Sequence, residues 1–327
     1  MILSVSRRTD IPAFFSEWFM NRLKERYVYV VNPMNAKLVS KVPITPNNVD
    51  CIVFWTKDAG PILEYLDEID TMGYKYYFQF TVTPYENDIE LNVRKKSDII
   101  STFITLSKKI GKEKVIFRYD PILITDNDKY TYEYHLKAFK RLCEHFRNHT
   151  ERVVISFIDG YKKVSKSMNN IGIRELTEKE MHGIADEFSK ITKYYNLRLE
   201  TCAEGIDLDT YGIKHSKCID GELIERVIGS KLKNTDKLGK SRSLCGCMKS
   251  IDIGQYDTCV HGCIYCYANR NKDLAAKNFK QHYLDSPLLL GKIDSLPENY
   301  QIKERKEDDT KSFREPLNIE CYTELDD

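Results

Sequence analysis

The sequence has no run of about 18 apolar residues, which a membrane-spanning helix requires. It also lacks the apolar core of a signal peptide, since Arg7 and Arg8 interrupt the short apolar segment at the start. Its 50 basic and 49 acidic side chains leave a net charge of +1, which gives no overall attraction to nucleic acid or membranes. These absences favour a cytoplasmic globular protein that does not bind membranes.

Cysteine is the residue type whose distribution is unusual. Ten cysteines in 327 residues suit neither a disulfide-dense secreted module nor an ordinary cytosolic enzyme. Seven of them lie between Cys202 and Cys266. Clustering of this kind in a reducing compartment indicates metal binding.

Cys259, Cys263 and Cys266 are spaced four and three positions apart, and no fourth cysteine follows with matching spacing. Structural zinc sites are closed by four protein ligands, whereas a cubane iron–sulfur cluster on three thiolates keeps one iron open. The spacing therefore favours a 4Fe–4S cluster with a free coordination position. The alternatives are a zinc site completed by a remote cysteine or by His261, and unrelated core thiols.

Short apolar runs alternate with amphipathic stretches over the first two hundred residues, which predicts an α/β fold with a parallel sheet. Six or more such units favour a full or partial (β/α) barrel. Residues 27–42 predict a hairpin insertion, and a capping box at Thr177 predicts a helix start. The runs expected to form strands are residues 2–5, 51–55, 76–82, 115–119, 153–157 and 197–200.

Polar residues follow these predicted strands at the edge where ligands bind in α/β folds. They are Lys57, Thr81, Thr83, Arg118 and Asp120. This agreement does not depend on the cysteine spacing.

With Tyr265 before its last cysteine, the cysteine stretch resembles the cluster loop of radical S-adenosylmethionine (SAM) enzymes. Residues 54–57, 81–83 and 118–122 also resemble, in the same order, strand ends of spore photoproduct lyase and its relatives. Their cluster loop precedes these segments, whereas here it follows them. A circular permutation reconciles the two orders, because chain termini are often close in compact domains.

In the permuted arrangement, residues 250–257 form the first barrel strand, residues 271–279 the helix after it, and residues 2–5 the second strand. Late cysteines of this kind also resemble a domain-of-unknown-function family with a C-terminal radical-SAM-like cysteine cluster, and the chain to about Leu290 fits it. The fold expected is thus a radical-SAM-type barrel, permuted so that the cluster-bearing strand lies near the C-terminus.

The resemblance implies that Cys259, Cys263 and Cys266 bind the cluster and that the open iron binds SAM. Reductive cleavage then gives methionine and a 5′-deoxyadenosyl radical, with flavodoxin or ferredoxin as the electron donor. The residues that it places in the cofactor site are Tyr265 beside the adenine, Lys57 near the SAM carboxylate, and Thr81, Thr83, Arg118 and Asp120.

Simpler roles remain open for some of these residues. The alternative for Lys57 is a structural ion pair at the barrel rim, and the alternative for Arg118 is a salt bridge with Asp120. No glycine–glycine–acidic segment is present for the SAM amino group, and residues 6–10 are candidates for that contact by position only.

Four further cysteines, Cys202, Cys218, Cys245 and Cys247, predict a second metal site. Four thiolates suit either an auxiliary 4Fe–4S cluster or structural zinc, and His215 can replace one thiol. The alternative is that they are ordinary buried or labile thiols.

The chain divides into a barrel body (1–200), a cysteine-containing insertion (201–249), the permuted strand with its loop and helix (250–295), and a peripheral tail (296–327). A second function remains open: a zinc- or cluster-stabilised nucleic-acid-binding protein that uses Arg7, Arg8 and the basic run 231–242. The substrate of an enzyme, whether a small molecule or a nucleic acid, does not follow from the sequence.

Overall fold

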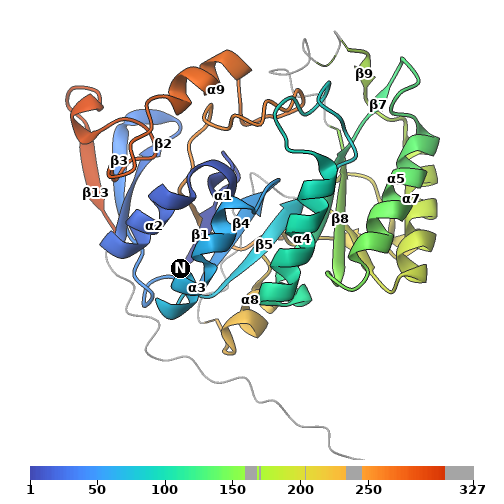
Figure 1. Cartoon of the computed structure of the whole chain (residues 1–327), viewed down its shortest axis with the longest axis horizontal. Helices are drawn as coiled ribbons and strands as arrows, with labels where there is room; N and C mark the ends of the chain where they lie inside the picture. Colours follow the sequence, from blue (N-terminus) through green and yellow to red (C-terminus); the bar gives the residue numbers. More distant parts are fainter. Residues whose placement is uncertain (159–167, 169–170, 203, 233–244, 306–327) are drawn as a thin grey trace, which may run out of the picture.

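A curved sheet of eight parallel strands forms the centre of the molecule (Figure 1). The computed structural model describes residues 1–158, 168, 171–202, 204–232 and 245–305. All six predicted strands are confirmed, with ends that differ by at most three residues. Across the sheet the strands are β11 (Lys214–His215), β10 (Arg198–Thr201), β8 (Arg152–Phe157), β6 (Val115–Ile122), β5 (Tyr76–Thr81), β4 (Cys51–Thr56), β1 (Ile2–Val5) and β12 (Ile251–Asp252).

The late strand β12 pairs in parallel with β1, where Leu3 lies opposite Ile251 and Ser4 opposite Asp252. The prediction that a strand near residue 250 neighbours the N-terminal strand is therefore confirmed, although β12 has two residues rather than the eight expected. Because β12 and β11 lie at opposite edges, the described residues form an open sheet. Of the two expected forms, a full or a partial barrel, the closed one is not present in the described residues.

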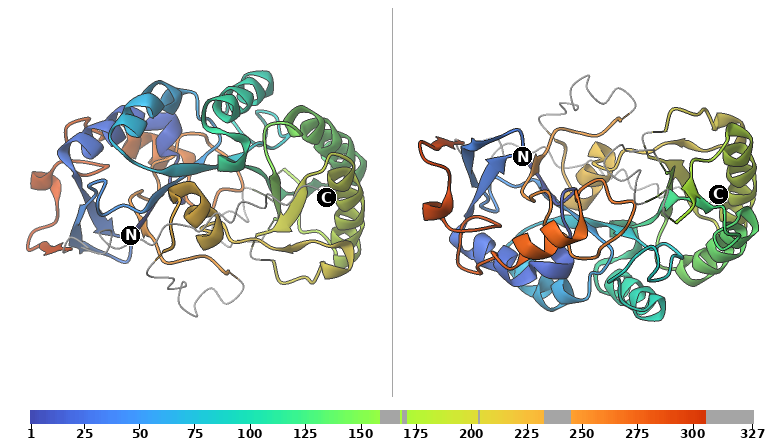
Figure 2. Two further views of the ribbon diagram at one scale, coloured as in Figure 1. Left: turned by 90° about the horizontal axis from the view of Figure 1, so that it is seen from below. Right: turned by 90° about the horizontal axis from the view of Figure 1, so that it is seen from above.

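The strands alternate between two apolar layers, since successive side chains point to opposite faces. On β4, Ile52 and Phe54 join the larger outer core, whereas Cys51 and Val53 join a smaller inner core. Figure 2 shows most helices along the outer face of the curved sheet and α8 (Gly221–Ile228) on the inner face. Leu223 and Ile224 of α8 complete the inner core.

The other helices begin and end at residues that satisfy free backbone groups. Thr177 forms the predicted capping box with Glu180, and Gly111 ends its helix at a φ of 98°. The α-helices are α1 (Ile11–Phe14), α2 (Ser16–Glu25), α3 (Leu66–Thr71), α4 (Lys96–Ile110), α5 (Tyr132–Phe146), α7 (Glu178–Tyr194) and α9 (Lys272–Phe279). Short 3-10 turns span Pro61–Tyr65, Lys112–Lys114, Asp209–Tyr211 and Ile293–Ser295.

Two small sheets lie beside the main one. The predicted hairpin is confirmed as β2 (Tyr27–Asn32) and β3 (Asn35–Pro43), and β13 (Gln301–Glu304) pairs in parallel with β3. Part of the segment expected as a tail is thus a strand, while residues 306–327 lie outside the described residues. β7 (Ile124–Thr125) and β9 (Ile173–Arg174) form the other sheet. Within the described ranges, no helix has the length and apolar character needed to cross a membrane.

Candidate functional site

The loop that follows β12 carries Cys259, Cys263 and Cys266, and backbone contacts close its base. The amide of Asp257 donates to the carbonyl of Ala268 at 2.9 Å, and Asn269 Nδ2 donates to the carbonyl of Cys259 at 2.7 Å. Burial raises the pKa of all three thiols, and at Cys259 the neighbouring Cys266 and Cys263 add to the effect. The three sulfurs therefore lie close enough to interact electrostatically, as ligands of one cluster must.

Residues 86–92, which follow β5, hold the cysteine loop from the other side, and we call them the clasp. Ile264 N–H donates to the carbonyl of Ile89 at 3.0 Å, and Asn92 N–H donates to that of His261 at 2.9 Å. Glu90 and Cys263 form an antiparallel bridge. The loop of the last strand is thus fixed against the carboxyl end of β5, on the far side of β1 and β4.

Glu90 is the polar centre of this contact, and its side chain is 1% exposed. Its carboxylate accepts hydrogen bonds from Lys57 Nζ at 2.7 Å and Thr83 Oγ1 at 2.6 Å, and from Lys96 and the Tyr265 hydroxyl. Burial alone would raise the pKa of Glu90, but Lys57 and Lys96 outweigh it and lower that pKa to about 2. The carboxylate is therefore ionised and binds the cysteine loop to β4 and β5.

Lys57 and Lys96 share this single carboxylate, so the three side chains carry a net charge of +1. The Lys57 ammonium lies 5.6 Å from the centre of the Tyr265 ring and interacts electrostatically with Cys263. A positive charge next to the cysteine loop suits an anionic group such as a carboxylate. Lys57 does form an ion pair, as its simpler interpretation expected, but the pair lies within the candidate site.

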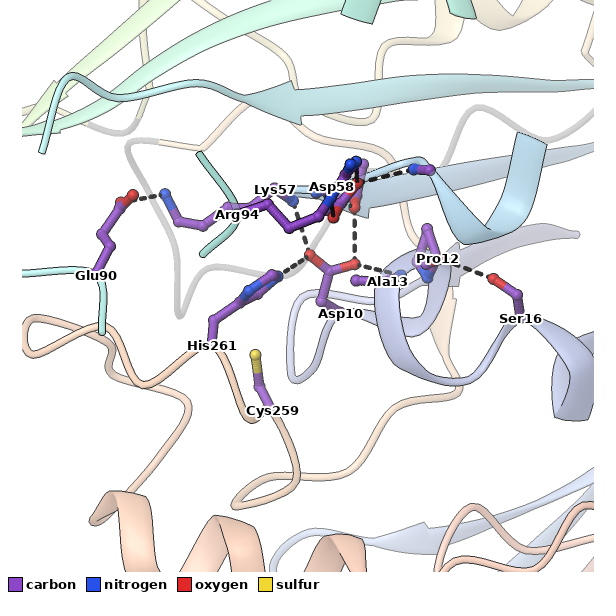
Figure 3. A network of polar contacts seen from close by, with 12 residues as sticks. Asp10, Pro12, Ala13, Ser16, Lys57, Asp58, Glu90, Arg94, Cys259 and His261 are labelled. Atoms are coloured by element: carbon purple, nitrogen blue, oxygen red, sulfur yellow. Dashed lines mark hydrogen bonds and ion pairs between the residues drawn. The ribbon is translucent and has the colours of Figure 1, made fainter. Parts of the chain in front are cut away.

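Asp10 and His261 form a second buried connection between the loop and the sheet (Figure 3). Asp10 Oδ2 accepts from His261 Nε2 at 2.9 Å and from the Lys57 amide at 2.7 Å. Its Oδ1 accepts from Thr56 Oγ1 at 2.8 Å. The other ring nitrogen of His261, Nδ1, is buried without a hydrogen-bond partner among the described residues. Asp10 thus fixes the histidine that separates Cys259 from Cys263.

Asp252 fixes the short strand β12 to the end of β1. Its carboxylate accepts from Ser4 Oγ at 2.8 Å, Ser6 Oγ at 2.6 Å and the Arg7 amide at 2.8 Å. A Cβ at Gly254 would lie 2.0 Å from Ser6 Oγ, so only glycine allows this approach. Of residues 6–10, the structure places Asp10 at the cysteine loop, and Ser6 and Arg7 at Asp252.

The other predicted cofactor residues lie on the inner face of the sheet. Arg118 Nε donates to Asp120 Oδ2 at 3.0 Å, which confirms the predicted pair, and its Nη1 donates to Cys218 Sγ at 3.0 Å. The structure therefore joins Arg118 to the second cysteine set, while its partner Asp120 also interacts electrostatically with Lys57. Thr81 ends β5 and pairs through its backbone with Arg118.

The family described as "Domain of unknown function (DUF1848)" matches residues 2–268, which is most of the chain. The chain belongs to the DUF1848 family. No curated protein matches it. A solved structure from Bacteroides thetaiotaomicron VPI-5482, assigned as an alpha-L-fucosidase, is 12% identical with a TM-score of 0.24. That match covers 49% of this chain and 66% of the other, and similarity this low supports no argument about fold or function.

In the described part of this DUF1848 chain, no group of three or more histidine, cysteine or acidic side chains is arranged to hold one metal ion. Ligands of a single ion must converge on one point, as in a tetrahedral zinc site. The thiolates of a cubane each bind a different iron and need no common point. The three loop thiols remain candidates for a cluster because of their spacing and position.

Sequence reasoning missed Glu90 and Asp252 and gave Asp10 no specific role. Asp252 lies inside the segment predicted as a strand, residues 250–257, and not at its end, where the strand-end signal that identified Lys57 and Arg118 applies. Glu90 had no such signal, because the clasp is irregular and its contacts with the cysteine loop arise only in the folded chain.

Proposed function

We propose that this protein is a radical SAM enzyme whose 4Fe–4S cluster binds to Cys259, Cys263 and Cys266. The observation that carries the proposal is the position of this three-cysteine loop. It lies against the carboxyl ends of parallel strands, beside two lysines and a glutamate that together carry a net charge of +1. Ligand sites in parallel α/β sheets lie at this edge.

The donor set fits the cofactors. Three thiols close in space provide three cluster ligands and leave one iron for SAM. When bound, the cluster and SAM supply an electron transfer that cleaves SAM and generates a 5′-deoxyadenosyl radical for hydrogen abstraction. In this proposal the Lys57 ammonium contacts the SAM carboxylate. Lys96 stays paired with Glu90 and so balances the charge of that carboxylate.

The remaining side chains position the loop and keep water away from it. Glu90 of the clasp accepts a hydrogen bond from Tyr265, and Asp10, which also binds the backbone after β4, accepts one from His261. Both ring residues are less than 10% exposed. Loops fixed by buried charged hydrogen bonds keep ligands oriented with little reorganisation. An external electron donor such as flavodoxin or ferredoxin completes the proposed system.

The nucleic-acid-binding alternative gains no support from the described residues. Arg7 and Arg8 each have a guanidinium nitrogen within 4.0 Å of Asp252, so a nearby carboxylate offsets their charge. The basic run 231–242 lies outside the described residues from 233 onward.

The test is electron paramagnetic resonance of the anaerobically reconstituted, reduced full chain, recorded with and without SAM. We expect a cubane signal that SAM perturbs, because SAM binds the open iron. The matched control is S-adenosylhomocysteine, which lacks the sulfonium methyl group and cannot be cleaved to methionine. A cubane signal that SAM leaves unchanged, together with no release of 5′-deoxyadenosine, would rule out the proposal.

A further inference from the structure

The structure brings together four cysteines from three separate segments, which we call the inner cysteine group. Cys202 follows β10, Cys218 precedes α8, and Cys245 and Cys247 precede β12. The sulfurs of Cys202 and Cys218 lie 3.1 Å apart. Cys218 is hydrogen-bonded to Cys247, and Cys247 to Cys245. The four thiols thus form a continuous chain of contacts on the inner face of the sheet.

This group is built into the core. Cys218 is 3% exposed and Cys247 is 1% exposed. The Tyr77 hydroxyl and Gln79 Nε2 both donate to the Cys218 carbonyl, at 2.7 and 2.9 Å. Two strand residues therefore fix the backbone that carries the central sulfur, as a preorganised ligand site requires.

Two sulfurs also accept hydrogen bonds from groups other than thiols. Arg118 Nη1 donates to Cys218 Sγ at 3.0 Å, and the Ile219 amide donates to Cys247 Sγ at 3.4 Å. Hydrogen bonds to sulfur of this kind are typical of the surroundings of iron–sulfur sites. An apolar core that merely used cysteine for packing would need neither donor.

We propose that Cys202, Cys218, Cys245 and Cys247 bind a second 4Fe–4S cluster, whose assembly releases the four thiol protons. Four protein thiolates complete the ligand set of such a cluster. Mononuclear zinc uses the same four thiolates, and the metal analysis below distinguishes it from the cluster. A disulfide between Cys202 and Cys218 would leave Cys245 and Cys247 without a role.

His215, the suggested substitute ligand, does not belong to this group. Its side chain is exposed, and its Nδ1 lies 3.3 Å from Thr201 Oγ1. The ligand set of the second cluster therefore consists of thiols alone.

The experiment measures iron and acid-labile sulfide in the full chain after anaerobic reconstitution with ferrous iron and sulfide. It compares the wild type with a triple variant (Cys259→Ala, Cys263→Ala, Cys266→Ala) and an inner double variant (Cys218→Ala, Cys247→Ala). Cys143→Ala, a buried cysteine outside both groups, is the matched control. We expect about eight irons per chain in the wild type and the control, and about four in each multiple variant.

The triple variant decides the inference, because it retains every inner cysteine. About four irons with a cubane spectrum support a second cluster. A triple variant that binds no iron, or that binds one zinc ion instead, overturns it. Should the inner double variant fail to fold, Cys245→Ala, at a less buried position, replaces it and is expected to lose the same iron.

The outcome is independent of the proposed function. Since the triple variant cannot bind the first cluster, its iron content reports the inner group alone. Iron in this variant, combined with no SAM effect in the wild type, would support the second cluster while ruling out radical SAM chemistry.

Discussion

The two cysteine groups of this molecule are assembled in opposite ways. Cys259, Cys263 and Cys266 lie within eight residues on one loop, so their spacing alone indicates a common ligand. The inner group draws on three segments that meet only because the strands and α8 place them on one face. The comparison shows that local spacing places candidate ligands on one loop, whereas clustered cysteines in separate segments only suggest a set, and the fold shows that they meet.

The charges around the two groups differ as well. The loop group faces two ammonium groups that share one carboxylate, which leaves a net positive charge for an anionic ligand. The inner group faces one guanidinium already paired with Asp120. The first environment favours binding of a further charged molecule, and the second favours a closed set of ligands.

Replacing a loop cysteine tests this contrast with the largest expected effect. Cys263→Ala is expected to abolish SAM cleavage, because it removes a cluster ligand, whereas Cys247→Ala should leave the SAM-perturbed signal in place. The measurement is 5′-deoxyadenosine release under dithionite, with Cys143→Ala as control. SAM cleavage retained by Cys263→Ala would contradict the assignment of the loop.

Glu90→Gln tests the charged centre next to the loop group. Removing one partner of a buried ion pair leaves uncompensated charge, so we expect a loss of about 3 kcal/mol in the free energy of unfolding. Urea unfolding of the metal-free chain at pH 7 measures it. Glu68→Gln breaks an exposed pair with Lys24 and should cost less than about 1 kcal/mol. Equal costs for the two variants would show that Glu90 has no special role.

Lys57→Met keeps the apolar stem and removes the charge at the loop group. We expect about tenfold weaker SAM binding, or about 1.4 kcal/mol, with unchanged iron content. SAM titration followed by the cluster spectrum measures the affinity, and Lys24→Met is the surface control. An affinity equal to that of the wild type would remove Lys57 from the SAM site.

Asn92→Ala gives the smallest expected effect, because it deletes one exposed hydrogen bond from the clasp. Asn92 Nδ2 donates to the Val260 carbonyl at 2.8 Å. We expect about threefold faster iron release to a chelator from the loop group, with the inner group's release unchanged. Asn21→Ala, which removes a similar bond to the Leu284 carbonyl, is the control. Faster release from both groups would show that they are not independent.

Much of the fold was predictable from the sequence because it is recorded in local patterns. The apolar runs identified six strands, and the position of polar residues after them placed Lys57 and Thr83 at the site edge. Helix α5 was overlooked, although Leu136, Phe139 and Phe146 follow a helical spacing in the sequence. The spacing of these apolar residues was a local signal sufficient to predict the helix.

Other features had no local signal. A sheet closes into a barrel only if its two edge strands pair with each other. The sequence pattern of the individual strands is the same for an open sheet and a barrel. The contacts of Glu90 join segments more than 170 residues apart in the chain, because its partner Tyr265 lies on the cysteine loop. Arg118 was expected in the cofactor site or paired with Asp120, but on the inner face it also contacts Cys218. Such pairings follow from three-dimensional proximity alone.

The pairing of β12 with β1 also determines the order of events during synthesis. β1 leaves the ribosome first, yet one of its neighbours appears only after some 250 further residues have been made. Domains generally fold from the N-terminal side during translation, so most of the sheet can form while this edge of β1 is still unpaired. The clasp, Asp10 and Lys57 are then already in place when the cysteine loop emerges. A cluster bound to that loop, as proposed, would therefore be inserted only after nearly the whole family domain has been translated.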